Sequence, residues 1–208
     1  MMMGLIKRQT ENKSDGIEKR SRKRDFAGLI NQLSSSSAKE RRWAAKDLAS
    51  YPEAARALLD RLEVEESASV REVIFSSLIQ IKDDVAISGL VDLLRSEDVS
   101  LRNGAVEALR EIGASVGPYV KKMLEDPDPD VRIFAINVMD SIDLPEIEEW
   151  LLNLIDREQN VNVCAVALEV LCNIGTDKSR GSIEKLKERF KDEPYIQYVA
   201  DIALKNID

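Results

Sequence analysis

The sequence contains no histidine, and only two of its 208 residues are cysteines. Without histidine the chain cannot form a Ser-His-Asp triad, a Cys-His pair or a histidine-ligated zinc or di-iron centre. Two cysteines are too few for a disulfide framework or a four-thiolate metal site. We therefore expect no metal, no cofactor and no catalytic site of these common kinds.

The chain also lacks a long apolar run. Its opening segment, Met1 to Ile6, is shorter than the apolar part of a signal peptide, and its basic residues follow it instead of preceding it. Cys164 and Cys172 lie eight residues apart on one expected helix, so their Cα atoms are ~12 Å apart, beyond the reach of a disulfide. Free thiols and the missing leader predict a cytoplasmic protein without a membrane span.

Charge is distributed unevenly along the chain. Residues 1–25 hold eight basic and four acidic residues, a net charge of +4, whereas the whole chain carries −8 and the remainder therefore −12. Apolar residues are sparse in this first segment, which predicts that residues 1–24 form a flexible basic arm in front of an acidic folded body.

The acidic body contains an internal repeat. Its template is an apolar residue, an arginine, two variable residues, a small or apolar residue, and a leucine or methionine four positions later, as in Val131-Arg132-Ile133-Phe134-Ala135 with Met139. Six copies follow one another at steps of 30 to 33 residues. Their second position is occupied in turn by Arg41, Arg71, Arg102, Arg132, Cys164 and Gln197.

Each copy has the pattern of a helical hairpin. Apolar residues recur at positions 0, 4, 8 and 11 of the template, which is one face of an α-helix, and a shorter apolar run precedes each copy. Asp98 and the pair Asp128-Pro129 stand where second helices should begin. The sequence therefore predicts an all-α domain of two-helix units spanning about 25–53, 54–84, 85–114, 115–143, 144–177 and 178–208.

Two-helix units that carry Asp-x-Val-Arg-x-x-Ala in the second helix resemble the HEAT-repeat family, in particular the short bacterial form named after the phycobilisome lyases. The resemblance covers roughly residues 25–208, and the segment from Asp128 to Ala135 is its closest copy. It implies a right-handed α-solenoid of about six two-helix HEAT-like repeats. Members of the family serve as scaffolds, adaptors, inhibitors and occasional enzymes, so the resemblance is specific for fold and not for function.

The four template arginines permit two interpretations. Arg41, Arg71, Arg102 and Arg132 would form a regular row of cations that could follow an anionic polymer. Alternatively, each arginine binds a carboxylate or a free carbonyl of the adjoining turn and holds one hairpin against the next. We favour this structural inter-repeat role, and expect the row to end where Cys164 and Gln197 replace arginine.

The solvent-facing side of the second helices is the candidate binding surface, because second helices usually line the concave side of such a solenoid. Template positions 2, 6 and 9 define this row, which begins with Arg42 and Lys46 and ends near Tyr198. We expect its central part to contact a protein partner, through Glu72, Asn103, Glu107, Arg110, Ile133, Asn137, Asp140 and Glu169. A merely solvated face remains the alternative.

Three classes of function remain open. A non-catalytic protein-binding scaffold or adaptor needs only the surface just described, and we favour it. A nucleic-acid binder would need a basic stripe, whereas the acidic body would leave only weak contacts through the arm. A bilin lyase-like subunit handling a tetrapyrrole would need a base, for which Glu107, Glu169 and Tyr198 are candidates in the absence of histidine. The identity of the partner, and whether the chain is a monomer or a homodimer, are not determined by the sequence.

Overall fold

The structure is a computed structural model that describes residues 24–207. The predicted basic arm, residues 1–24, therefore lies outside the described residues except for Arg24. Within the described part the regular structure is entirely helical.

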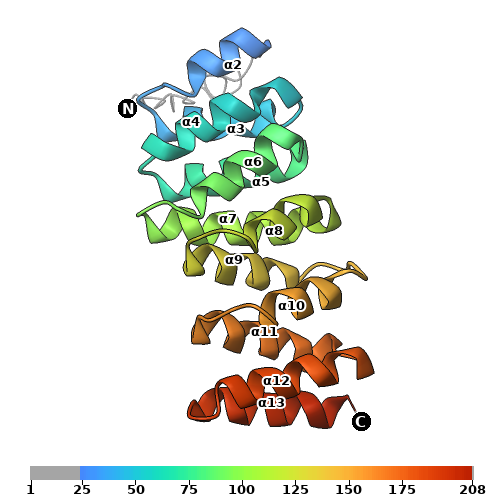
Figure 1. Ribbon diagram of the computed structural model, residues 1–208. Coiled ribbons are helices and arrows are strands. Elements are labelled where there is room, and N and C mark those ends of the chain that lie inside the picture. Colours follow the sequence, from blue (N-terminus) through green and yellow to red (C-terminus); the bar gives the residue numbers. More distant parts are fainter. Residues whose placement is uncertain (1–23, 208) are drawn as a thin grey trace, which may run out of the picture.

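The α-helices follow one another as six hairpins, which we call repeats 1 to 6 (Figure 1). Short 3-10 turns precede the first helix of repeats 2, 4 and 6. The six pairs are α2 (Phe26–Gln32) with α3 (Ala38–Leu48), α4 (Ala55–Val64) with α5 (Ala68–Ile81), α6 (Asp84–Leu93) with α7 (Val99–Ile112), α8 (Gly117–Met123) with α9 (Pro129–Met139), α10 (Ile147–Ile155) with α11 (Val161–Ile174), and α12 (Arg180–Arg189) with α13 (Pro194–Asn206).

Side-chain caps mark the start of several second helices, as the sequence predicts. The carboxylate of Asp98 accepts hydrogen bonds from the backbone N–H groups of Ser100 and Leu101 at the start of α7. Asp128 caps α9 in the same way, with Pro129 in the first turn, and the amide oxygen of Asn160 caps α11. These contacts satisfy N–H groups that have no partner within the helix.

The apolar template positions form the core. In repeat 3, Leu101, Ala105 and Leu109 occupy positions 0, 4 and 8 and are at most 4% exposed. One continuous apolar core runs from Leu29 to Ala203, because each hairpin buries its apolar faces against the hairpins before and after it.

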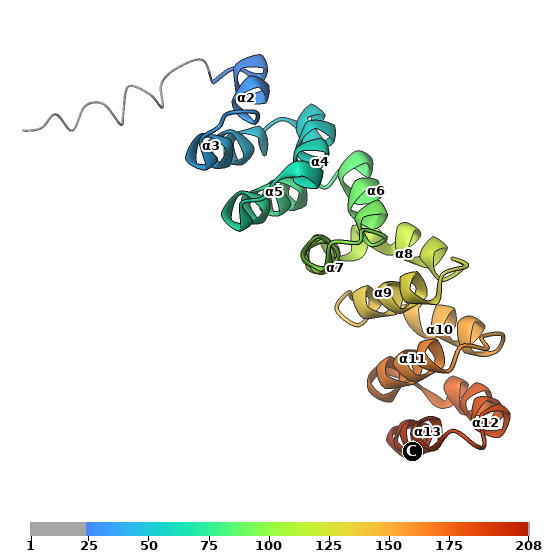
Figure 2. The ribbon, with the colours of Figure 1, turned by 90° about the vertical axis from the view of Figure 1, so that its left-hand side faces the viewer.

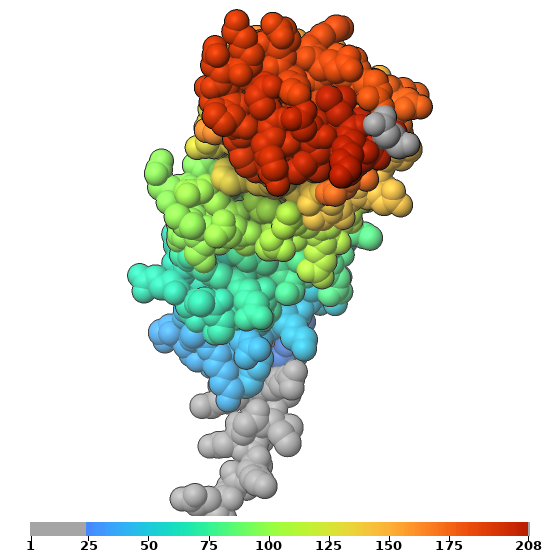
Figure 3. All heavy atoms as spheres, turned by 90° about the horizontal axis from the view of Figure 1, so that it is seen from below, coloured from blue at the N-terminus to red at the C-terminus, as the bar shows by residue number. Residues whose placement is uncertain are grey.

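Stacking of the hairpins gives the molecule a curved, elongated shape (Figure 2). Each second helix packs against the next one along the row α3, α5, α7, α9, α11 and α13, and this packing is more extensive than that between successive first helices. Figure 2 shows the second helices on the inner side of the curve and the first helices on the outer side. Seen from its C-terminal end, the molecule shows repeat 6 in front and earlier repeats as successive bands behind it (Figure 3).

The predicted all-α solenoid is therefore confirmed, and its second helices line the concave side. The longest helices, α5, α7 and α11, have 14 residues. In the described part of the chain no helix combines the length and the apolar character needed to span a bilayer.

Gly89 of α6 lies against the side chain of Leu59 in α4. A Cβ atom on Gly89 would lie 2.2 Å from Cδ1 and 3.0 Å from Cγ of Leu59, which is itself 7% exposed. By contrast, a Cβ atom on Gly181 in α12 would meet no atom within 4 Å. Gly89 is thus a packing position between first helices, whereas Gly181 is not.

We expect the two glycines to respond oppositely to substitution. Gly89→Val should lower the free energy of unfolding by about 1 to 3 kcal/mol, because the added side chain displaces Leu59. Gly181→Ala should raise it by about 0.5 to 1 kcal/mol, since alanine is the better helix former and space is free. Urea unfolding followed by circular dichroism measures both. A Gly89→Val protein as stable as the wild type would contradict the close packing of α4 and α6.

Candidate functional site

Arginine–carboxylate contacts link repeats 1 and 2 at the turns between first and second helices. The guanidinium of Arg41 donates to both carboxylate oxygens of Glu65, from Nε and Nη2, at 2.7 Å each. Its Nη1 donates to the carbonyl oxygen of Ser35, six residues earlier, at 2.9 Å. Arg41 therefore joins the turn of its own repeat to the turn of the next.

Repeats 4 and 5 are joined in the same way. Arg132 donates from Nε and Nη2 to the carboxylate of Glu158 at 2.7 and 3.0 Å, and from Nη1 to the carbonyl oxygen of Asp126 at 2.7 Å. Glu158 is 8% exposed and also accepts from the backbone N–H groups of Gln159 and Asn160. Bidentate contacts between arginine and a carboxylate are among the strongest hydrogen bonds in proteins.

The two central arginines vary the arrangement. Arg71 donates to the carbonyl oxygen of Glu65 and, at 2.8 Å, to the Asp98 carboxylate in repeat 3. Arg102 donates to Ser96 of its own repeat at 2.6 Å, and within residues 24–207 it makes no contact of this kind with repeat 4. The reason is that Asp126, the acidic residue at the corresponding turn, is paired with Arg95 instead. The expected inter-repeat contact of Arg102 is therefore absent from the described chain.

The template row of arginines ends at repeat 5, but an arginine still joins repeats 5 and 6. The thiol of Cys164 lies 3.8 Å from the Glu158 carbonyl oxygen, and Gln197 donates within its own repeat. Arg189, in the last turn of α12, donates to carbonyl oxygens at the end of α10 and the turn that follows, with distances of 3.0, 3.0 and 2.6 Å to Ile155, Asp156 and Glu158. The expectation that arginine contacts stop at repeat 5 is thus wrong.

Sequence reasoning missed the acidic partners of these arginines. Glu65, which is 0% exposed, and Glu158 both stand six residues before the template's second position, and this spacing was visible in the sequence. Hydrogen bonds from Arg41 outweigh the effect of burial and, with those from Ser67 and Arg61, lower the pKa of Glu65 to about 2. Burial alone would raise the pKa of Glu158, but hydrogen bonds from Asn160 and Arg132 hold it below its usual value.

Cys164 is buried and Cys172 is half-buried. Burial raises the pKa of the Cys164 thiol to about 12, and burial likewise raises that of Cys172. A thiol with a raised pKa is a weak nucleophile at neutral pH. Among residues 24–207, no group of three or more Cys, Asp or Glu side chains is arranged to hold a metal ion.

The predicted binding row lies on the concave face. It is carried by α5, α7, α9 and α11, which pack side by side (Figure 2). Five of its members are exposed, namely Glu72, Asn103, Glu107, Asp140 and Glu169, while three are half-buried, namely Arg110, Ile133 and Asn137. The fold thus brings all eight to one face, where exposed carboxylates predominate.

The half-buried members also hold the second helices together. Nε of Arg110 donates to the backbone carbonyl oxygen of Asn137 at 3.0 Å, and its Nη1 donates to Glu107 at 3.1 Å. Cys172, at the same template position in repeat 5, contacts the Val199 carbonyl oxygen of repeat 6. Arg110 and Cys172 therefore lie in the seam between successive second helices, whereas Asp140, at the same template position in repeat 4, is exposed. Arg110 is thus only partly available to a partner.

A groove opens on the concave face between α3 and α5. It has a volume of about 390 Å³ and contains the cationic side chains of Arg42 and Lys46, both of which are exposed. Trp43, Val73 and Ser76 are among its other lining residues. Unlike the carboxylate-rich row, this part of the concave face is basic.

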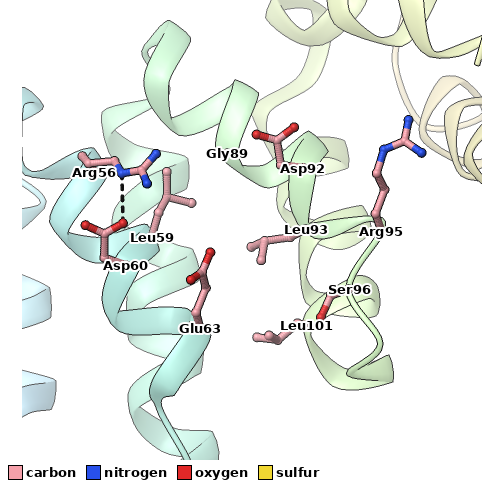
Figure 4. A pocket seen from close by; sticks show the side chains of 10 residues that line it. All are labelled: Arg56, Leu59, Asp60, Glu63, Gly89, Asp92, Leu93, Arg95, Ser96 and Leu101. Carbon is pink, nitrogen blue, oxygen red and sulfur yellow. Dashed lines mark ion pairs between the residues drawn. The ribbon is translucent and has the colours of Figure 1, made fainter.

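A second groove, of about 320 Å³, lies on the convex side between α4 and α6 (Figure 4). Arg56 and Asp60 form an ion pair at one edge, at 2.9 Å, while Glu63 and Asp92 lie on the facing helices. Leu59 lies beside Gly89, and both line the groove. This groove is separate from the predicted row.

A family model described as HEAT repeats matches residues 26–110 and 118–207. The chain belongs to the HEAT-repeat family. No protein in the curated comparison set matches it. Among solved structures it is similar to Mini spindles TOG3 of Drosophila melanogaster, with 16% identity, a TM-score of 0.53 and coverage of 86% of this chain and 92% of that one.

Two further solved structures match this HEAT-repeat chain. An archaeal HEAT-like repeat protein from Thermococcus onnurineus NA1 has 16% identity and a TM-score of 0.50, with coverage of 86% of this chain and 85% of that one. The CpcE and CpcF complex of phycocyanin lyase from Nostoc has 19% identity and a TM-score of 0.35, with coverage of 86% and 93%. Identities this low show a shared fold and not a shared function.

Removing Arg132 should destabilise the HEAT-repeat solenoid. Arg132→Ala leaves the buried Glu158 carboxylate with only its two backbone N–H donors and without its cationic partner, so we expect the free energy of unfolding to fall by about 1 to 3 kcal/mol. Arg157→Ala is the matched control, because its side chain is exposed and makes no ion pair within the described residues. Urea unfolding measures both, and a change within about 0.3 kcal/mol for Arg132→Ala would argue against a stabilising role.

Acid should weaken the contact between repeats 1 and 2. Because the pKa of Glu65 is about 2 in the folded chain and 4.5 ordinarily, its contribution is present above pH 4.5 and is lost as pH falls through 2. Glu65→Gln should therefore cost about 2 to 4 kcal/mol at pH 7 and reduce the loss of stability between pH 5 and 2. Unfolding measured at several pH values tests this, with exposed Glu63→Gln as the control; equal pH slopes for wild type and Glu65→Gln would refute it.

Proposed function

We propose that this HEAT-repeat protein is a non-catalytic scaffold or adaptor that binds a protein partner along its concave second-helix face. The observation that carries the proposal is the continuous, largely exposed row on α5, α7, α9 and α11. Successive second helices lie ~10 Å apart, so four of them offer a surface ~30 Å long. A surface of this length accommodates a helix or an extended segment of a partner.

The composition of the row supports protein binding. Asn103 and Asn137 stand at helix positions where lysine or glutamate would stabilise the helix better. Exposed Glu107 and half-buried Ile133 lie on the neighbouring helices α7 and α9, so the row contains an apolar side chain among polar ones. Mixed surfaces of this kind are typical of interfaces between proteins that also exist separately.

The template arginines support a structural role and not a ligand-binding one. Arg41 and Arg132 each use their donors on one carboxylate and on carbonyl oxygens of their own turn. A phosphate group would have to displace these contacts and take from the buried Glu65 or Glu158 carboxylate its two hydrogen bonds from the guanidinium, which is costly. The concave row therefore remains the better candidate for recognition.

The lyase-like alternative has less support. Its candidate bases, Glu107, Glu169 and Tyr198, are all exposed and lie on three different helices, α7, α11 and α13. A base that acts on a bound tetrapyrrole needs a pocket that brings it close to the ligand and excludes water. Neither groove described above contains any of these three residues.

Reversing charge in the middle of the row should weaken partner binding. Replacing Glu107 and Asn137 together by lysine should raise the dissociation constant at least tenfold, about 1.4 kcal/mol, because it changes the potential of the surface at its centre. The partner is first isolated by affinity purification from the native cell, and its binding is then measured by calorimetry. Helical circular dichroism should be unchanged, since neither position is fully buried.

The matched control places the same two changes on the convex side. Glu149→Lys with Asn153→Lys on α10 alters the net charge equally at two exposed positions, and should leave binding unchanged. If the variant with Lys at 107 and 137 binds every purified partner normally, the recognised surface lies elsewhere on the molecule.

A further inference from the structure

The groove between α3 and α5 carries an unusual concentration of positive charge. Lys39, Arg42 and Lys46 follow one another at spacings of three and four residues, so they share one face of α3. All three are exposed, in a chain whose net charge is −8. Like charges at these spacings repel and destabilise a helix by about 0.2 to 0.5 kcal/mol per pair. Helix stability therefore does not account for this arrangement.

The two cations that line the groove have no ionic partner in the part of the chain that the structure describes. Within residues 24–207, neither Arg42 nor Lys46 makes an ion pair or a side-chain hydrogen bond. Lys39, just outside the groove, lies over the Trp43 ring, 4.7 Å from its centroid. Every template arginine, by contrast, is engaged by carbonyl or carboxylate oxygens. The guanidinium of Arg42 and the ammonium of Lys46 are thus free to bind an anion.

The groove offers more than charge. Ser76 and Gln80 of α5 add polar side chains to its wall, while Trp43 and Val73 provide apolar surface. A volume of about 390 Å³ is enough for one or two amino-acid side chains. A carboxylate that enters it meets a planar guanidinium, which binds carboxylates through two parallel hydrogen bonds, next to a mobile ammonium.

The neighbouring surface determines what kind of anion fits. Beyond the groove, repeats 2 to 5 each place one carboxylate in the concave row, namely Glu72, Glu107, Asp140 and Glu169. A nucleic acid or an anionic membrane would be repelled by these four groups as it extended past the groove. A ligand that is negative only at one end, and positive over the rest of its length, complements the whole face.

We propose that the groove between α3 and α5 anchors the acidic end of a partner segment whose basic residues then lie along the carboxylate row of repeats 2 to 5. The proposal rests on the proposed function, since it specifies the partner of the same concave face. Successive repeats are ~10 Å apart, which equals about three residues of extended chain. The complementary segment therefore carries a basic residue at every third position.

Synthetic peptides test this chemistry directly. The probe is a fluorescent 15-residue peptide with two glutamates at one end and four lysines at every third position, separated by serine and glycine. The reference peptide has glutamine in place of both glutamates. Fluorescence anisotropy with the full chain should give a dissociation constant at least tenfold lower for the probe than for the reference.

The variant Arg42→Gln with Lys46→Gln should abolish this tenfold preference without weakening the reference peptide, because it removes only the anion-binding groups. The matched control, Arg157→Gln with Lys185→Gln, removes the same two kinds of cation at exposed positions outside the concave face and should retain the preference. Circular dichroism verifies that both variants are folded, which is expected because all four positions are exposed.

Several results would overturn the proposal. These are equal affinity for the two peptides, loss of the preference in the matched control, and equal weakening of both peptides by the groove variant. Binding of a labelled 15-nucleotide single strand that is lost in the groove variant would identify the groove as a polyanion site instead. Self-association of the chain that disappears in this variant would identify a second copy as the occupant.

The experiments distinguish failure of this groove proposal from failure of the proposed protein-binding function. If Glu107→Lys with Asn137→Lys leaves binding of the purified partner unchanged while the peptide preference holds, the groove binds acidic segments but the central row does not bind the partner. If the partner is sensitive and the peptides are not distinguished, the concave face binds a protein without using the groove for an acidic end.

Discussion

The structure depends on one constraint, which is that a hairpin of about 30 residues has two apolar faces and cannot bury both by itself. In repeat 3, Leu101 and Leu109 of α7 are buried, and α7 packs against α5 and α9 of the neighbouring repeats as well as against α6 of its own. The same requirement in every unit produces the stack, and the more extensive packing of second helices places them on the inner side of the curve. Core packing alone therefore produces the concave face, whether or not that face binds a partner.

Buried ion pairs at the turns determine how hairpins such as repeats 1 and 2 are aligned with each other. Glu65 and Glu158 are almost fully buried, and each carboxylate accepts two hydrogen bonds from an arginine of the preceding repeat. A hairpin shifted relative to its neighbour would take these two hydrogen bonds and their positive charge from a buried carboxylate, which is costly. The arginines that hold repeats 1 and 2, and repeats 4 and 5, therefore fix the register between hairpins. They also leave the solvent-facing side of the second helices free to vary.

The sequence was sufficient for the fold, because its strongest signals are local. Apolar spacing and capping residues such as Asp98 and Asp128 depend on contacts within one hairpin, and both predicted the helices correctly. Contacts between repeats were harder to foresee. Arg102 lacks its expected acceptor because Arg95 occupies Asp126, and Arg189 acts from a position outside the template. The groove beside Arg42 was not predictable either, since its depth depends on how α3 and α5 pack against each other.

Within residues 24–207, each repeat packs only against the repeats before and after it, and this determines how a bound segment would affect unfolding. Repeat 1 and repeat 5 share no packing surface in the stack, so the folding of one reaches the other only through the units between them. A chain lying along the inner curve from α3 to α11 would touch both at once. Its binding would link distant units directly, and the solenoid would then unfold more cooperatively, in fewer and larger steps.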